Sequence, residues 1–497
     1  MSLLDWLVLG AFACLTVGTG IYYSQKNKSA DDYLLGGRSM SPIVLGLSLF
    51  ATLVSSLSYL GTPGEMISHG PMMILQVAAH PFVFIIVGYG LIPLLIRQPV
   101  TSAYELLEKR LGMSIRMAGA TVFLLLRFGW MATILYATSS KILVPILSLD
   151  ADRTLWLCIG LGVIAASYSA WGGMKAVVTT DAIQSITMLL GAVATLAVIT
   201  WRMGGIANWW PNDWPAHWQE PSWGFDPVPR VSFGILLVST ILWYVCTNGS
   251  DQMSIQRFLS TRDAVGARKA LAVSQISDVI VSVLLGLTGF AILSFYQLYP
   301  PELAEGQTLS SIGDQLFPRF ILNEMPSGLA GLIIAALLSA ALSSLSSGLN
   351  SACAVIEKDF LPARMEDESS GASTVRRLQA MTWGVAVVVI ALSLLNLLIE
   401  GNIIERCFKM VNLLTAPLFV LFFLALFVRR SNAFGAWVGL LCSIATAVAI
   451  AYAKDLDLPI TVSFVWMMPC SLLAGVTAGI VASIMTAPWY KASGTPS

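Results

Sequence analysis

The chain has 497 residues, of which 56% are hydrophobic and only 11% are charged. A soluble protein of this length would carry about 25% charged residues, so the composition excludes a soluble fold. The 28 basic and 28 acidic residues leave no net charge, and the seven cysteines form no CxxC pair, which argues against a disulfide or zinc framework.

Apolar runs of about 20 residues, the length of a helix that crosses a bilayer, recur from end to end. We predict thirteen transmembrane helices, at 5–24, 42–62, 72–96, 117–146, 154–171, 181–202, 231–248, 270–296, 326–353, 378–400, 407–428, 435–453 and 463–487. With the N-terminus outside, nineteen lysines and arginines fall on the inner side and six on the outer side, as the positive-inside rule requires. The sequence therefore predicts an all-α, multi-pass protein embedded in the lipid bilayer of the cell membrane.

The second predicted helix mixes apolar residues with hydroxyl residues, among them Ser55 and Ser58, before it reaches Gly61 and Pro63. This composition near mid-membrane suits a helix whose backbone hydrogen bonds are interrupted. In the third predicted helix, His80 is isolated among apolar residues, and we favour a hydrogen-bonded packing role for it over a functional one.

Asp181 lies at the inner end of the sixth predicted helix. A carboxylate at a helix N-terminus is favourable because of the helix dipole, so a capping role is one interpretation. The other interpretation is an anionic ligand for a cation, because the predicted fold places Asp181 opposite a serine-rich helix near its inner end.

The segment 231–248 runs into the polar residues from Asn248 to Asp251. This segment and the second predicted helix are the first members of successive five-helix sets. Matching interrupted helices in two halves predict an inverted-repeat transporter with a binding site at the midplane. We therefore divide the chain into a leading helix and inner loop (1–40), two five-helix repeats (41–230 and 231–430) and two trailing helices with a short inner tail (431–497).

Four residues with i, i+3, i+4, i+7 spacing share one face of the predicted helix at 326–353, namely Ala340, Ser343, Ser344 and Ser347. A hydroxyl in hydrocarbon costs free energy unless it finds a partner. Close helix packing is one explanation for this string, because Ser and Ala let helices approach each other. Hydroxyls and freed backbone carbonyls are also the oxygen ligands that hard cations such as Na⁺ prefer.

Three separated motifs resemble signatures of the sodium/solute symporter family. They are Gly172-Gly173-Met174-Lys175-Ala176-Val177 with Thr180, Asp181 and Gln184, then Gln256-Arg257-Phe258-Leu259-Ser260-Thr261-Arg262-Asp263, and Gly331-Leu332-Ile333-Ile334-Ala335-Ala336 before the serine helix. The resemblance covers essentially the whole chain, and residues 55–65 are similar to the branch that holds monocarboxylate, multivitamin, iodide and sialic-acid symporters. It implies a LeuT-type inverted-repeat fold and the coupling of a sodium gradient to solute uptake.

The resemblance also implies which residues bind sodium. The common sodium site of the family lies between the first interrupted helix and the serine helix. Its ligands here would be the carbonyls of Ala51, Val54 and Ala340 and the hydroxyls of Ser343 and Ser344. A second site, present in some members, would use Asp181, Ser343, Ser346 and Ser347. We therefore expect two sodium ions.

By position, six residues are expected to contact the solute, namely Ser55, Ser58, Gln76, Arg127, Trp130 and Asn248. Sialic-acid symporters hold the substrate carboxylate with an arginine on the fourth helix, and this position here is Trp130, with Arg127 three residues earlier. Because a charge at lipid depth is costly, we favour a functional role for Arg127 over a structural one, with Asp278 as a candidate partner. The alternative for the serines is helix packing.

These observations predict a sodium-coupled symporter, and not an enzyme, that imports a small organic solute by alternating access. We expect an organic anion, either a monocarboxylate or a sialic-acid-like compound, and a functional monomer without nucleic-acid partners. The alternatives are a symporter for a neutral sugar or amino acid and, in a different class, a sodium-responsive membrane sensor. We expect no cytoplasmic output domain, which a sensor would need.

Overall fold

The computed structural model describes residues 1–27, 29–98, 100–211, 213–361, 371–396, 403–453, 455–459 and 462–492, and every regular element within these ranges is a helix. The long helices are α1 (Leu3–Ser24), α8 (Met113–Ala137), α10 (Thr154–Arg202), α11 (Phe233–Ser250), α13 (Ala264–Leu298), α15 (Leu329–Val355), α16 (Gly371–Leu395), α17 (Ile403–Phe427), α18 (Ala433–Ala451) and α19 (Met467–Ala492). The shorter ones are α2 (Ala30–Leu35), α3 (Pro42–Leu53), α4 (Ser56–His69), α5 (His80–Ile85), α6 (Ile92–Ile96), α7 (Glu105–Leu111), α9 (Val144–Ile146), α12 (Gln252–Leu259) and α14 (Gly313–Glu324). A 3₁₀ segment, η2 (Pro71–Ala79), and a π-helical segment, η3 (Ile86–Leu91), lie on either side of α5.

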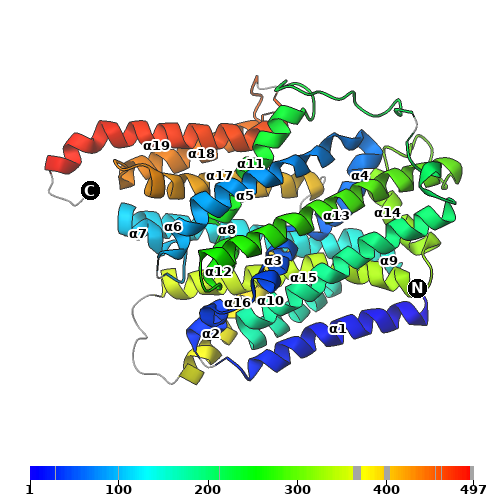
Figure 1. The fold of residues 1–497 in the computed structure, drawn as a ribbon, viewed down its shortest axis with the longest axis horizontal. Helices are drawn as coiled ribbons and strands as arrows, with labels where there is room; N and C mark the ends of the chain where they lie inside the picture. The colour runs from blue at the N-terminus through cyan, green and yellow to red at the C-terminus, as the bar shows by residue number, and fades with distance from the viewer. Residues whose placement is uncertain are drawn as a thin grey trace.

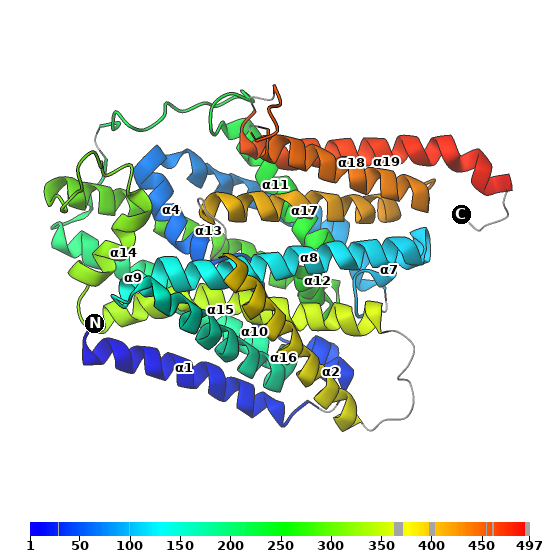
Figure 2. The ribbon, with the colours of Figure 1, turned by 180° about the vertical axis from the view of Figure 1, so that it is seen from behind.

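The helices form a bundle in which α3, α10 and α15 lie between α1 on one side and α18 and α19 on the other (Figures 1 and 2). In the apolar window of the span that contains α15, 83% of the residues are buried. In the corresponding window of α1, 22% are buried. The central helix is therefore the one that carries the serine cluster. Leu3 in α1 and Trp201 at the end of α10 are 77% and 78% exposed, as expected for side chains that face lipid.

Ten helices in the described residues are long and apolar enough to cross a membrane, or eleven if one bent pair is counted as a span. The predicted count of thirteen is therefore not confirmed. The predicted segments 154–171 and 181–202 form the single helix α10, and the second predicted helix is divided between α3 and α4. In addition, only Val411–Phe427 of α17 is counted, as a shorter apolar helix. The N-terminus and the end of α19 lie at opposite ends of the molecule (Figure 1).

Helix α10 turns at Gly173. A straight helix of its 49 residues would be on the order of 74 Å long, more than twice the thickness of a bilayer core. Gly173 has φ 58° and ψ −156°, a conformation that only glycine adopts readily, and a Cβ there would lie 2.8 Å from Tyr33. This glycine divides α10 into two membrane-length segments.

Two helices are interrupted at mid-length, as the sequence predicts. The helix α3 ends at Leu53, Val54 is extended (φ −88°, ψ 122°), and Ser55 caps α4 by accepting a hydrogen bond from the Ser58 amide. The break therefore falls among the hydroxyl residues, and α4 continues through Pro63. The second break lies at Asp251 (φ −85°, ψ 123°), whose carboxylate accepts a hydrogen bond from the Met253 amide at the start of α12.

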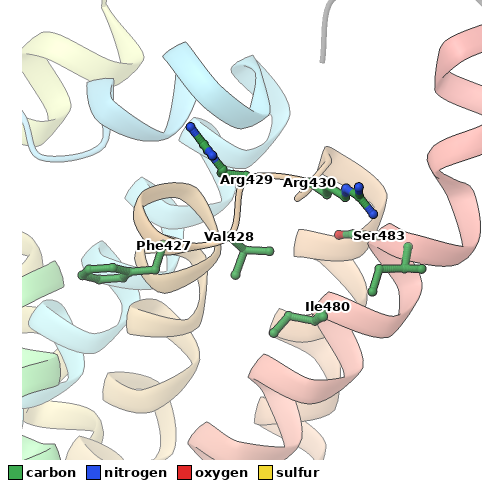
Figure 3. Close-up of a pocket in the computed structure, with 7 residues that line it drawn as sticks. Phe427, Val428, Arg429, Arg430, Ile480 and Ser483 are labelled. Atoms are coloured by element: carbon green, nitrogen blue, oxygen red, sulfur yellow. The ribbon is translucent and has the colours of Figure 1, made fainter.

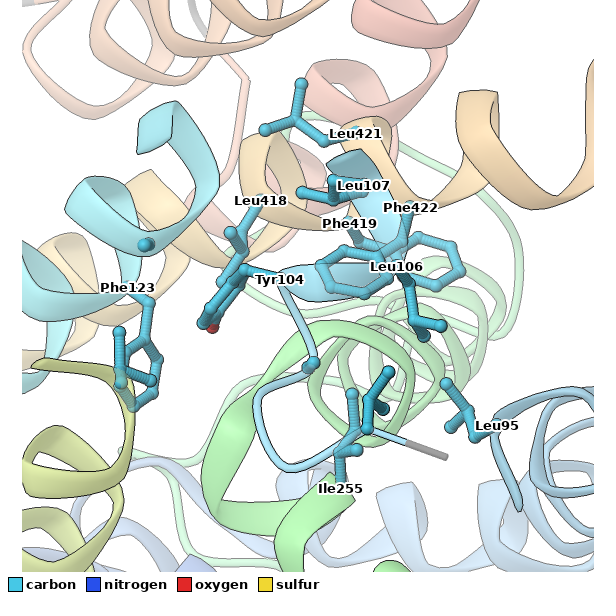
Figure 4. Packing of buried hydrophobic residues seen from close by; sticks show 14 of the residues in the cluster. Leu95, Tyr104, Leu106, Leu107, Phe123, Ile255, Leu418, Phe419, Leu421 and Phe422 are labelled. Atoms are coloured by element: carbon cyan, nitrogen blue, oxygen red, sulfur yellow. The ribbon is translucent and has the colours of Figure 1, made fainter. Parts of the chain in front are cut away.

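A buried aromatic cluster supports the second break (Figure 4). The Tyr104 ring lies 5.6 Å from Phe123 and 5.8 Å from Phe422, and its hydroxyl donates a hydrogen bond of 3.1 Å to the Ser250 carbonyl. This carbonyl is one of the groups that the end of α11 leaves without a helical partner. The division of the chain into repeats at 41–230 and 231–430 stays a prediction.

Candidate functional site

The serine cluster of α15 contacts the broken end of α3. The Ser343 hydroxyl donates a hydrogen bond of 2.7 Å to the Ala51 carbonyl, and the Ser344 hydroxyl donates one of 3.3 Å to the Thr52 carbonyl. Ser343 also lies 3.3 Å from the carbonyl of Ala340 in its own helix. All of these side chains are fully or nearly fully buried.

The broken helix explains why these carbonyls are available. The last four carbonyls of a helix have no intrahelical partner, and α3 ends at Leu53 in the middle of the bundle. Only the Phe50 carbonyl accepts a further helical hydrogen bond, from the Val54 amide at 3.0 Å. The contact between α3 and α15 therefore concentrates backbone and hydroxyl oxygens in a buried place, with the extended Val54 beside it.

A second polar cluster lies around Asp181. Its Oδ2 accepts hydrogen bonds from the hydroxyls of Ser48 (2.6 Å) and Ser347 (3.0 Å). Its Oδ1 is buried and has no hydrogen-bond partner among the described residues. The Ser346 hydroxyl instead donates to the Ser343 carbonyl at 3.2 Å, within α15. The structure thus brings Asp181 and Ser347 together and leaves one carboxylate oxygen free.

The cation nearest to Asp181 is Arg257, which the sequence analysis did not identify as a site residue. Its Nη2 donates to Asp181 Oδ2 at 2.9 Å and to the Ser347 hydroxyl, and its Nε donates to the Ser48 hydroxyl at 2.9 Å. Arg257 is 1% exposed and Asp181 is fully buried. The sequence did contain a signal for this residue. Arg257 belongs to the motif that follows the second broken helix, at a membrane depth where a charge needs a partner.

The predicted solute residues lie in different environments. Ser55 is buried and lies 3.2 Å from the Ser58 hydroxyl, whereas Ser58 is exposed. Gln76 and Trp130 are half-buried. Asn248 is buried, donates a hydrogen bond of 2.8 Å to the Tyr244 carbonyl, and keeps its side-chain oxygen without a partner in the part of the chain that the structure describes.

Arg127 forms an ion pair with Asp251, at the break between α11 and α12. Both side chains are buried, and the Arg127 guanidinium also lies 5.8 Å from the centre of the Phe123 ring. The predicted partner, Asp278, was wrong. Asp278 instead lies 3.2 Å from His80 and accepts a hydrogen bond from the Tyr244 hydroxyl.

An ionic cluster covers the outer end of α4. Arg230 donates a hydrogen bond of 2.9 Å to Glu65, and His69 lies 3.2 Å from the same carboxylate. Asp314 of α14 approaches so closely that a Cβ on Gly64 would lie 2.2 Å from its Oδ1. Asp314 as a whole is exposed, but the contact with α4 partly desolvates its carboxyl, and this desolvation together with the nearby Glu65 carboxylate raises the pKa of the Asp314 carboxyl.

A surface hollow lies elsewhere, between the end of α17 and α19 (Figure 3). It is lined by Phe427, Val428, Arg429, Arg430, Ile480, Ser483 and Ile484. None of these is a predicted site residue, and apolar side chains supply much of the lining. We therefore do not assign the solute to this hollow.

Three comparisons with known proteins agree. The model of the sodium:solute symporter family matches residues 33–443. The sodium/sialic acid symporters NanT of Aliivibrio fischeri and SiaT of Proteus mirabilis are 27% and 28% identical to this chain, over 98% of its length and 94% and 96% of theirs. The mouse sodium-coupled monocarboxylate transporter 1 is 29% identical, over 92% of this chain and 74% of its own.

A solved structure of a Na⁺-coupled sialic acid symporter, substrate-bound and outward-open, superimposes with a TM-score of 0.82 at 25% identity, covering 98% of both chains. The nucleobase-cation-symport-1 family transporter Mhp1 shares the fold, with a TM-score of 0.59 at 14% identity over 93% of this chain and 95% of its own. These matches agree with the all-helical bundle described above. The chain belongs to the sodium:solute symporter family and is a sodium-coupled symporter with a LeuT-like fold.

Proposed function

We propose that this symporter imports a small organic anion, of the monocarboxylate or sialic-acid class, together with two sodium ions. The observation that carries the proposal is the contact of the Ser343 and Ser344 hydroxyls with the carbonyls at the broken end of α3. Sodium bound there would join the broken helix to α15, so that its release alters the relative position of the two. This is what alternating access requires of an ion site.

The first sodium ion would be held by neutral oxygens, namely the carbonyls of Ala51, Val54 and Ala340 and the hydroxyls of Ser343 and Ser344. Both hydroxyls already donate hydrogen bonds to carbonyls of α3, Ser343 to Ala51 at 2.7 Å and Ser344 to Thr52 at 3.3 Å. A sodium ion between them would accept lone pairs from hydroxyl and carbonyl alike and replace these hydrogen bonds. The burial of Ala51, Ala340, Ser343 and Ser344 supports a dehydrated ion.

The second sodium ion would lie against Asp181, Ser343, Ser346 and Ser347. The free Asp181 Oδ1 supports this assignment, because a buried carboxylate oxygen without a donor is costly unless it meets a cation. Arg257 already neutralises Asp181, so sodium would bring a net positive charge to this site. We therefore propose that the second ion binds more weakly than the first.

Two sodium ions supply enough free energy for uptake of an anion. Each gains about 2.3 kcal/mol per 100 mV and about 1.4 kcal/mol for a tenfold gradient. The pair therefore supplies roughly 7.4 kcal/mol, of which an inward-moving monoanion consumes about 2.3. The remaining ~5 kcal/mol supports a several-thousand-fold accumulation, and the cycle would carry net positive charge inward.

The similarity of this chain to known proteins supports an anionic solute, because the relatives include sodium/sialic acid symporters and a sodium-coupled monocarboxylate transporter. The N-terminus of α4 offers a place for a carboxylate, because the Ser55 cap accepts only the Ser58 amide among the first amides of this helix. The positive end of a half-helix at mid-membrane attracts anions. Ser55, Ser58, Gln76, Trp130 and Asn248 would supply the remaining contacts.

A neutral sugar or amino acid is the second candidate, and one observation favours it. The Arg127 guanidinium, which is a candidate to bind a carboxylate, is neutralised by Asp251. A neutral solute would need only the hydroxyl and amide groups around the two breaks, and it would leave this ion pair intact.

Measuring uptake into proteoliposomes distinguishes an anionic solute from a neutral sugar or amino acid. Radiolabelled N-acetylneuraminate, lactate, glucose and proline would each be offered with an inward gradient of Na⁺ or of choline. We expect sodium-driven uptake of one of the two carboxylates, inhibited by an excess of the same class. Sodium-driven uptake of glucose or proline alone would overturn the anion and support the second candidate.

A further inference from the structure

A cluster of titratable side chains lies in the membrane interior, apart from both sodium clusters. His80 begins α5, Tyr244 belongs to α11, and Gln275 and Asp278 belong to α13. His80 Nδ1 lies 2.5 Å from Gln275 Oε1, and its Nε2 lies 3.2 Å from Asp278 Oδ2. The Tyr244 hydroxyl donates to the same carboxylate oxygen, and its ring centre lies 5.1 Å from that of His80.

The cluster lies at mid-membrane depth. His80 follows Pro71, at the start of its span, by nine residues, and Tyr244 follows Phe233 by eleven. At about 1.5–2 Å per residue these positions are roughly 14–18 Å from the helix starts, half the thickness of a bilayer core. His80 is 5% exposed, and the Asp278 side chain is 13% exposed.

Charge neutrality at this depth requires one bound proton. The pair carries no net charge either as imidazolium with carboxylate or as neutral imidazole with carboxylic acid. Without the proton, a net negative charge remains in the membrane interior, which is strongly unfavourable. The proton is shared between coupled groups, so it belongs to the pair and not to one atom.

Among the described residues of the elements packed against α5, no other charged side chain lies beside this pair to balance Asp278. Of the elements packed against α5, η2 contributes no titratable side chain, and α11 contributes Tyr244 and the thiol of Cys246. In η3, Tyr89 lies more than two turns further along, where the Arg268 guanidinium of α13 stacks on its ring at 4.8 Å. The positive charge that balances Asp278 is therefore a proton.

The cluster is next to the predicted solute residues on two helices. Gln76 precedes His80 by four residues, and Asn248 follows Tyr244 by four and donates a hydrogen bond of 2.8 Å to its carbonyl. We propose that His80 and Asp278, with Tyr244, form a proton-binding site, and that this transporter requires a bound proton as well as sodium. The proton comes from water and returns to water, and no bond other than N–H or O–H is made or broken.

The chain has only three histidines, so the assignment is testable by substitution. The first readout is the melting temperature of the purified full-length protein in saturating NaCl between about pH 5.5 and 8.5, where histidine titrates. For the wild type we expect the melting temperature to fall as pH rises, because the pair loses its proton. The double variant His80→Gln/Asp278→Asn, in which the pair is neutral at every pH, is expected to show a smaller fall than the wild type.

The control is His217→Gln. His217 is exposed at the outer surface and lies 2.9 Å from the Ile67 carbonyl, so its loss is expected to leave the wild-type profile unchanged. Equal pH profiles for the wild type and the double variant would overturn the proposal. So would a profile that His217→Gln abolishes.

Tyr244→Phe keeps the proposal testable if the double variant does not fold. It removes the hydroxyl that stabilises the carboxylate, so the midpoint of the pH dependence is expected to move to higher pH by about one unit. An unchanged midpoint would overturn the proposal. These measurements use Na⁺ and protons alone, so they stand whichever solute is transported. The pH profile of sodium-driven uptake then shows whether transport follows the same midpoint, and uptake that is independent of pH would contradict the requirement for a proton.

Discussion

The Arg127 guanidinium donates a hydrogen bond to the Asp251 carboxylate at the point where α11 ends and α12 begins. The same carboxylate caps α12 through the Met253 amide. Arg127 thereby anchors α8 to the second broken helix. Its position in the sequence predicts a contact with the solute, but the structure also gives it a structural partner, Asp251. Substitution separates the two roles.

We expect Arg127→Met alone to destabilise the protein by about 3–5 kcal/mol, because it leaves the Asp251 charge buried and unpaired. The double variant Arg127→Met/Asp251→Asn removes both charges, and Asn is a good helix cap. It is expected to regain stability in thermal unfolding. If Arg127 acts only through Asp251, the double variant also regains uptake. A stable double variant without uptake would show that Arg127 contacts the solute.

Asp181→Asn is expected to lower the Hill coefficient for sodium from above one towards one while uptake continues. The substitution removes the charge that would hold the second ion and leaves the first cluster intact. It also leaves Arg257 without its carboxylate, so some loss of stability is expected. The double variant Asp181→Asn/Arg257→Gln is expected to restore stability but not the Hill coefficient. A wild-type Hill coefficient in both variants would contradict a sodium ion at Asp181.

The ionic cluster at the outer end of α4 predicts a pH effect on stability. The pKa of the Asp314 carboxyl is raised in the folded protein, so ionisation of this group opposes folding. The unfavourable contribution is absent below the pKa of the unfolded chain and appears as pH rises through the folded pKa. We expect Asp314→Asn to melt at a higher temperature than the wild type at about pH 7.5. The difference should shrink towards about pH 4.5, and a constant difference would point to packing instead of charge.

Gly173 is expected to tolerate no side chain. Gly173→Ala places a Cβ at positive φ and 2.8 Å from Tyr33, so we expect a loss of about 1–3 kcal/mol or more in the free energy of unfolding. Gly160→Ala is the matched control, since Gly160 lies in the same helix with nothing within 4 Å of an added Cβ. Equal stability of the two variants would show that the turn in α10 does not depend on glycine.

The sequence predicted the serine face well because the spacing of Ser343, Ser344 and Ser347 fixes one side of any helix that contains them. It also predicted that two helices are interrupted. The first break falls at Val54 and Ser55, among the hydroxyl residues where the sequence indicated it, while α4 continues through Pro63. Neighbouring helices compensate for proline in a membrane helix, so proline alone does not mark a break.

The pairing of buried charges was the part that the sequence did not reveal. Arg127 and Asp251 are 124 residues apart, and Arg257 and Asp181 are 76 apart, so no local pattern connects them. The predicted partner Asp278 was wrong because only the packing of α5 against α13 shows that it meets His80. The interpretation of His80 as a hydrogen-bonded residue was confirmed by its contact with Gln275.

The contact between α3 and α15 is expected to bind sodium, and this is measured as the thermal stability of the purified protein in NaCl compared with choline chloride. Sodium at 100 times its Kd would stabilise the folded state by about 2.7 kcal/mol. We predict this effect in the wild type and in Ser339→Ala, whose hydroxyl bonds only to Ala335 in its own helix. Ser344→Ala, which loses the hydroxyl that faces the Thr52 carbonyl, is predicted to lose most of the effect. Full sodium stabilisation of Ser344→Ala would show that sodium does not bind at this contact.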